Sequence, residues 1–191
     1  MTALAAEVPN NLIRWRYLGY AVAALGIMVA VIVSGHLWSL NFVHVFSSLL
    51  WTGIDLFLGF VLGPVLRGQP VAIRRDIARK LTPRTLFLMP TVAIISGTSG
   101  WFLAVHLGYL QVPWPYFGWV VAALVLVTAM TIQGLGFLTP VNVLVCLELQ
   151  KPQPDLGRIA RLMQGYFYAV ALQGAMQVAM IAIMTRFRVG L

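Results

Sequence analysis

Three histidines are the side chains of this sequence best suited to bind a metal ion or a haem. They are His36, His44 and His106, and each lies at one end of a long apolar run. With a rise of about 1.5 Å per helical residue, His44 and His106 both fall within roughly 5 Å of one membrane boundary. Histidine is the commonest metal ligand and a frequent axial ligand of haem. We therefore predict His44 and His106 as ligands of haem b iron, with His36 as a further candidate. The alternative is that interfacial histidines simply tolerate water and headgroups.

A polar stripe runs along one of these apolar segments. Its members recur at steps of three and four residues: His44, Ser48, Trp51, Asp55, Gly59 and Leu62. Such steps place side chains on one face of a helix, so this face is expected to turn toward other helices. We predict that Trp51, together with Ser99 from a later segment, forms part of a cofactor pocket.

Asp55 is expected near the middle of the membrane, where a charge is costly unless it is neutralised or paired. This position predicts a role in proton handling. The alternative is structural, with a protonated carboxyl hydrogen-bonded to one of four nearby polar residues: Thr52, Thr98, Ser99 or Gln133.

Methionines recur every four residues at Met176, Met180 and Met184, with Gln173 and Gln177 beside them. Thioethers are suitable ligands for Cu(I), so this ladder is a candidate copper path. Adaptable packing is the other explanation for such a stripe.

The composition indicates that lipid surrounds most of the chain. Of 191 residues, 60% are hydrophobic and 9% are charged, whereas soluble domains carry roughly a quarter charged residues. The net charge of +8 does not indicate nucleic-acid binding, because Asp55 is the only charge between Tyr17 and Leu66 and none occurs from Thr85 to Leu147. The basic residues instead flank apolar runs, as in membrane proteins.

A membrane-spanning helix needs about 20 apolar residues, and this length predicts an all-α bundle in a single transmembrane domain over residues 1–191. The five predicted spans are 17–36, 41–66, 85–106, 116–138 and 163–185. We expect Pro140 to kink the fourth helix, which can continue to residue 148. The basic segment 72–80 is expected to be a short surface helix or turn.

The Lys and Arg residues predict the orientation. All thirteen except Arg186 and Arg188 fall on one side of a five-span topology, and the basic side is normally cytoplasmic. We therefore expect an integral protein of a bacterial inner membrane with a cytoplasmic N-terminus and the histidines near the outer leaflet.

Residues 41–67 resemble the histidine-containing helix of HemJ-type protoporphyrinogen oxidases and CopD-like copper-resistance membrane proteins. Both groups have a histidine, then an aromatic and glycine patch, then an apolar run that ends in basic residues. Here these are His44, the Trp51-Thr52-Gly53 patch and Arg67. The resemblance continues through 81–84, 89–97 and 117–119, and covers roughly residues 41–120. It implies that His44 is associated with haem b.

The sequence departs from the HemJ-type pattern after Gly118-Trp119. That group continues with a second histidine and a lysine, whereas this chain has Val120, Val121, Ala122 and Ala123. A ligand on which the oxidase activity would depend is therefore missing from its place. His106 is the obvious substitute by depth, followed by His36.

These observations favour a membrane b-type haem protein, or a subunit of one, that handles electrons with a redox partner or other membrane subunits. A CopD-like copper-handling protein is the second hypothesis. The third is a non-catalytic bundle subunit of a larger complex that binds lipid or pigment. The sequence contains no nucleophile–base pair, phosphate loop or covalent haem motif that would indicate soluble-enzyme chemistry.

Overall fold

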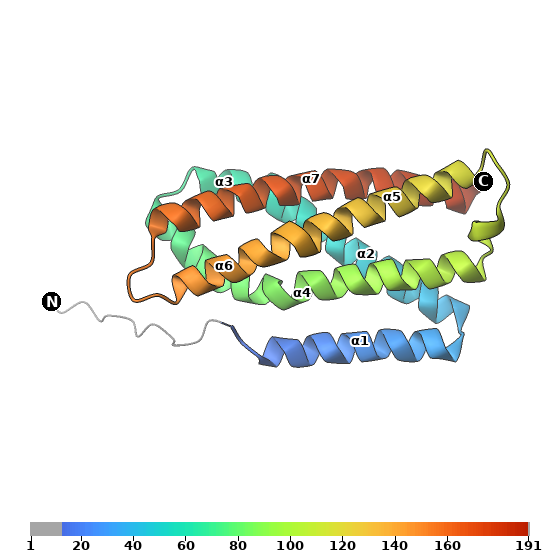
Figure 1. Cartoon of the computed structure of the whole chain (residues 1–191), viewed down its shortest axis with the longest axis horizontal. Helices are drawn as coiled ribbons and strands as arrows, with labels where there is room; N and C mark the ends of the chain where they lie inside the picture. The colour runs from blue at the N-terminus through green and yellow to red at the C-terminus, as the bar shows by residue number, and fades with distance from the viewer. Residues whose placement is uncertain (1–12, 191) are drawn as a thin grey trace.

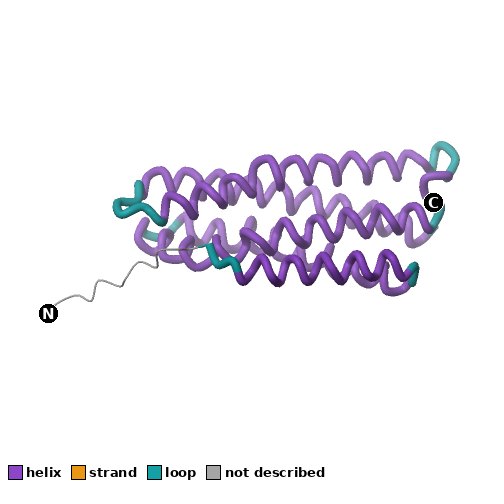
Figure 2. The backbone as a smooth tube through the Cα atoms, turned by 60° about the horizontal axis from the view of Figure 1, so that its bottom comes forward, coloured by secondary structure: helices purple, strands orange, loops and turns teal. Residues whose placement is uncertain are grey.

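The structure is a computed structural model that describes residues 13–190. Within this range, five helical segments are long and apolar enough to cross a membrane, and they lie side by side as a bundle (Figures 1 and 2). The same residues contain no strand. The predicted all-α bundle of five spans is confirmed, and the chain is an integral membrane protein. Residues 1–12 and 191 of the predicted domain lie outside the described range.

Two of the five spans are single helices broken by one wide π-helical turn. The elements in chain order are α1 (Arg16–Ser34), α2 (Leu37–Leu56), η1 (Phe57–Leu62), α3 (Gly63–Arg67), α4 (Val71–His106), η2 (Tyr109–Gln111), α5 (Phe117–Gln133), η3 (Gly134–Leu138), α6 (Thr139–Leu149) and α7 (Leu156–Val189). The elements η1 and η3 are π-helical, whereas η2 is a 3₁₀ turn. The second span therefore comprises α2, η1 and α3, and the fourth comprises α5, η3 and α6.

Two helices begin well before the predicted spans. Helix α4 begins at Val71, so the basic segment 72–80 is part of the third helix and not a separate surface element. Helix α7 begins at Leu156, where the Asp155 carboxylate accepts a hydrogen bond from the Arg158 backbone N–H at 2.9 Å. This hydrogen bond stabilises the charged carboxylate and lowers the pKa of Asp155. The apolar pattern marks only the part of each helix that lies in lipid.

Each π-helical turn ends two residues before a proline. Pro64 follows η1 and Pro140 follows η3. Proline lacks an N–H and its ring presses on the carbonyl one turn earlier, and a wider turn relieves this conflict. The Thr139 hydroxyl donates to the Gly134 carbonyl across η3 at 2.9 Å. The fourth helix therefore passes through Pro140 and ends at Leu149, which confirms the predicted continuation.

Small residues let the second span approach α7 closely. A Cβ atom added to Gly59 would lie 2.6 Å from Cα of Ala171, and one added to Gly63 would lie 3.1 Å from the Phe167 side chain. Only residues without a side chain allow two backbones to approach this far. Gly59 and Gly63 therefore bring the second span into close contact with α7.

The bundle has two chemically different ends. The start of α1, the α3–α4 connection and the α6–α7 connection share one end (Figure 1). We call it the basic end, because it carries most of the Lys and Arg residues. The opposite end holds His36 and His106 beside the α1–α2 and α4–α5 connections.

Candidate intramembrane binding site

The His44 side chain lies between α2 and α4 in a fixed orientation. Its Nδ1 lies 3.0 Å from the backbone carbonyl of Ser96 and 3.4 Å from the Ser99 hydroxyl. A carbonyl only accepts hydrogen bonds, so Nδ1 carries the proton when this bond forms. The lone pair of the neutral ring is then on Nε2, the arrangement found in metal-binding histidines.

Gly100 provides the space for this imidazole. A Cβ atom at this position would lie 2.7 Å from Cε1 of His44. The neighbouring turn of α4 also binds α2, because the Ser48 and Ser96 hydroxyls lie 2.6 Å apart. The serine and glycine residues of α4 therefore set the position of His44.

The other two histidines are exposed and interact within their own helices. Nδ1 of His36 accepts from the Ser39 backbone N–H, so this residue caps the start of α2. Nδ1 of His106 lies 2.8 Å from the Phe102 carbonyl. No hydrogen bond between histidines is found in residues 13–190, and no group of three His, Cys, Asp or Glu side chains in this range is placed to hold a metal ion. Ligation of one haem by His44 and His106 stays a prediction.

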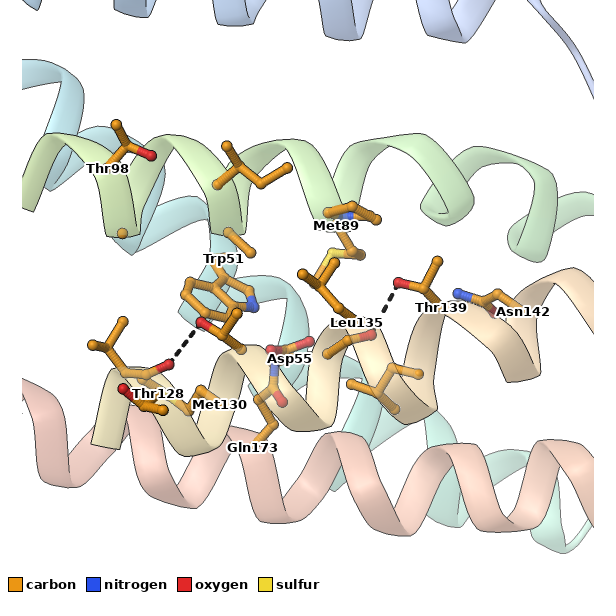
Figure 3. A pocket seen from close by; sticks show the side chains of 18 of the residues that line it. Trp51, Asp55, Met89, Thr98, Thr128, Met130, Leu135, Thr139, Asn142 and Gln173 are labelled. Carbon is orange, nitrogen blue, oxygen red and sulfur yellow. Dashed lines mark hydrogen bonds between the residues drawn. The ribbon is translucent and has the colours of Figure 1, made fainter. Parts of the chain in front are cut away.

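A cavity of about 560 Å³ lies between α4 and α5. Trp51 and Asp55 of α2 and Gln173 of α7 also line this cavity. Figure 3 shows the side chains of Trp51 and Gln173 directed toward Asp55. Other wall residues include Met89 of α4 and Met130 of α5. The cavity thus combines mainly apolar walls with a few polar side chains, of which Asp55 and Gln173 are the most deeply buried.

Asp55 is fully buried at 0% exposure, and only one of its two oxygens is hydrogen-bonded. Oδ2 accepts from Nε2 of Gln177 at 3.0 Å, whereas no donor in the described structure reaches Oδ1 in hydrogen-bond geometry, although the Trp51 and Gln173 side chains are directed toward this carboxyl. Gln173 is 2% exposed, and its Oε1 also has no partner there. Two acceptor oxygens of cavity-lining residues are therefore left without donors.

The hydrogen-bond partner of Asp55 differs from the four predicted ones. None of the described hydrogen bonds joins Asp55 to Thr52, Thr98, Ser99 or Gln133, and the Gln133 amide instead donates to the Ala169 carbonyl. The missed signal is the pair of glutamines one turn apart on α7, since two amides on one helix face can both reach a carboxyl on a facing helix.

The predicted pocket residues lie at two separate places. Ser99 is fully buried beside His44, where its hydroxyl donates to the Ile95 carbonyl, whereas Trp51 lines the cavity beside Asp55. His44 does not line the cavity. The predicted site is therefore two separate places along α2: His44 lies beside Ser99, and Asp55 lies beside Trp51 in the cavity.

Two methionines of the predicted ladder pack in the protein core. Met176 and Met180 lie against a buried cluster formed by Trp51, Val92 and Met130, and Met184 is half-buried further along α7. The packing explanation accounts for the first two. The copper path stays a prediction that no contact of these residues tests.

The chain matches no protein-family model, no curated protein sequence and no solved structure. The functional argument therefore rests on the side chains of the site itself.

Proposed function

We propose that this protein binds a lipid-soluble small molecule in the cavity between α4 and α5. The observation that carries the proposal is a buried carboxyl with an unpaired oxygen lining a mainly apolar space of about 560 Å³. Small-molecule sites have volumes of roughly 300–1,000 Å³ and combine apolar walls with a few polar groups that orient the ligand. This proposal is close to the lipid- or pigment-binding role among the three hypotheses from the sequence.

The rim of the cavity supports entry from the bilayer. Ile94, Trp101 and Leu135 line the cavity and are 42%, 48% and 48% exposed, and all three belong to membrane spans. Apolar side chains exposed along a span face lipid tails. A ligand that enters between them comes from the membrane, so it must be soluble in lipid.

A bulky side chain inside the cavity is expected to abolish ligand binding. Gly97 lines the cavity, and a Cβ atom there meets Val127 only at 3.9 Å, so Gly97→Phe directs its ring into the space. In lipid vesicles, a photoactivatable phenyl-diazirine is expected to label cavity-lining peptides of the wild type. The ring then occupies the space of the ligand, so the variant should show labelling reduced about tenfold or more, which corresponds to at least about 1.4 kcal/mol of affinity.

Gly26→Phe is the matched control for this experiment. Gly26 lies on the exposed side of α1, where an added Cβ meets nothing within 4 Å. Labelling of the cavity should remain at the wild-type level in this variant. Equal labelling of cavity peptides in Gly97→Phe would contradict the proposed function.

Haem binding by His44 is a second candidate function, and a specific observation favours it. The hydrogen bond from Nδ1 to the Ser96 carbonyl leaves Nε2 of His44 as a free ligand atom. A haem bound there would supply one-electron chemistry, with His44 as one axial ligand. The second ligand would have to come from a side chain that the described structure does not bring to His44.

Substitution of His44 tests this candidate. Protein produced with added haem is expected to show a Soret band, which His44→Ala should remove and Gly100→Ala should shift, because the added methyl displaces the ring. If His106→Ala changes the spectrum while His36→Ala does not, His106 is the second ligand. A wild type without a Soret band would reject haem binding.

We further infer that the basic end faces the cytoplasm and that the membrane is a bacterial inner membrane. The beginning of α1 and the two basic connections lie together at that end (Figure 1). Short basic loops are retained on the cytoplasmic side.

A further inference from the structure

We propose that the ligand of the cavity has an aromatic head group with hydroxyl donors, of the phenol or quinol class, and that Asp55 and Gln173 accept hydrogen bonds from these hydroxyls. This inference rests on the proposed function, which provides a lipid-soluble ligand for the cavity. It adds the chemical class of the ligand.

The unpaired oxygens define what the ligand must provide. Oδ1 of Asp55 and Oε1 of Gln173 are buried and lack donors in the described structure, and both residues line the cavity. Leaving a buried acceptor unsatisfied costs about 1–3 kcal/mol. Lipid tails at the rim offer no hydrogen bonds, so a ligand with hydroxyl or amine protons satisfies these atoms best.

The route of entry favours a neutral donor over a cationic one. The sequence has no charged residue from Thr85 to Leu147, so α5 and the inner part of α4 offer no second charge beside the cavity. An ammonium group would have to leave water and pass along the lipid-exposed rim, which is strongly unfavourable. A phenolic hydroxyl is neutral and partitions into the bilayer.

The walls favour an aromatic ring as the carrier of these hydroxyls. Trp51 and Trp101 line the cavity together with the thioethers of Met89 and Met130. Flat rings pack favourably against indoles in stacked or edge arrangements, and sulfur contacts ring edges well. An apolar tail can then extend past Trp101 into the surrounding lipid.

A comparison of quinol and quinone tests the inference on the wild-type protein. The two forms have nearly the same shape, but the quinone has only acceptor oxygens, which would face Oδ1 of Asp55 and Oε1 of Gln173 without a hydrogen bond. A site built to bind donors rejects such an analogue strongly. We expect decyl-benzoquinol to bind at least about tenfold more tightly than decyl-benzoquinone, since one unpaired acceptor alone costs about 1–3 kcal/mol. Quenching of tryptophan fluorescence in nanodiscs measures both affinities.

Variants of the two acceptors provide a second measurement. Gln173→Leu and Asp55→Leu are each expected to reduce the preference for the quinol by about fivefold or more, because each removes one acceptor. Gln164→Leu, an exposed position on the same helix, should retain the full preference. Loss of the preference in this control as well would overturn the assignment to Gln173.

The outcomes separate this inference from the proposed function. If the diazirine labels the cavity but quinol and quinone bind equally, or if decylamine binds more tightly than the quinol, the phenol and quinol assignment is overturned while the proposed function stands. If neither the diazirine nor the quinol reaches the cavity, both are rejected.

Discussion

Replacing Gly59 by alanine is expected to destabilise the bundle by about 1–3 kcal/mol, the usual cost of forcing a methyl group into a packed contact. The added Cβ atom would lie 2.6 Å from Cα and 2.8 Å from N of Ala171. These are backbone atoms of α7, so the contact is relieved only if a whole helix moves. Thermal unfolding of the purified protein in detergent, followed by circular dichroism, measures the effect as a lower midpoint.

Two further variants separate this contact from a general effect of glycine. Gly53 lies on the same span with nothing within 4 Å of an added Cβ atom, so Gly53→Ala should have an unchanged or slightly higher midpoint. Ala171→Gly should not rescue Gly59→Ala, because it leaves the backbone atoms in place. A full rescue would show that the contact is with the Ala171 methyl group and would contradict the argument.

Removing the amide that binds Asp55 is expected to cost about 1–3 kcal/mol, because it leaves the second carboxyl oxygen unsatisfied in a buried position. Nε2 of Gln177 is the donor at 3.0 Å, and both residues are buried at 3% and 0% exposure. Gln177→Leu keeps a side chain of similar volume and removes the donor. The same unfolding measurement should show a lower midpoint, whereas Gln164→Leu on the exposed face of α7 should change it little.

A double-variant cycle identifies the interaction itself. In an Asp55→Leu background no carboxyl is left without a donor, so Gln177→Leu should cost much less than it does alone. We expect a coupling free energy of at least about 1 kcal/mol, within the range for residues in direct contact. Additive effects would mean that the glutamine and the aspartate do not depend on one another.

The number and type of the helices could be predicted from the sequence because lipid imposes a simple condition. Every backbone polar group in the membrane must be satisfied within its own segment, so an apolar run of sufficient length forms a helix. The beginnings of α4 at Val71 and α7 at Leu156 could not be obtained in this way. Apolar composition reports where lipid surrounds the chain, whereas a helix ends where its hydrogen-bonding pattern ends.

The sequence predicted which residues of the candidate site are buried, but it did not predict which side chains hydrogen-bond to them. The polar stripe correctly placed Trp51 and Asp55 inside the bundle, where both are buried. It could not identify Gln177 as the partner of Asp55, since the rotation of α7 about its own axis depends on packing along its whole length. Similarly, His36 and His106 lie at one end of the bundle and bind within their own helices, whereas the ring of His44 is turned onto α4 at Ser96.

The π-helical turn η1 determines the direction in which the side chains after it face around the axis of the second span. Each residue advances a helix by about 100°, so the extra residue of a wide turn rotates the downstream face by that angle relative to an uninterrupted α-helix. Leu66, which is 3% exposed, lies downstream of this turn and packs in a buried cluster with Phe167 and Val170 of α7. A related polypeptide one residue shorter within Phe57–Leu62 would have the residues after the deletion rotated by about 100° relative to those before it. Alignments of distant relatives should therefore allow a one-residue gap at this point and again at Gly134–Leu138.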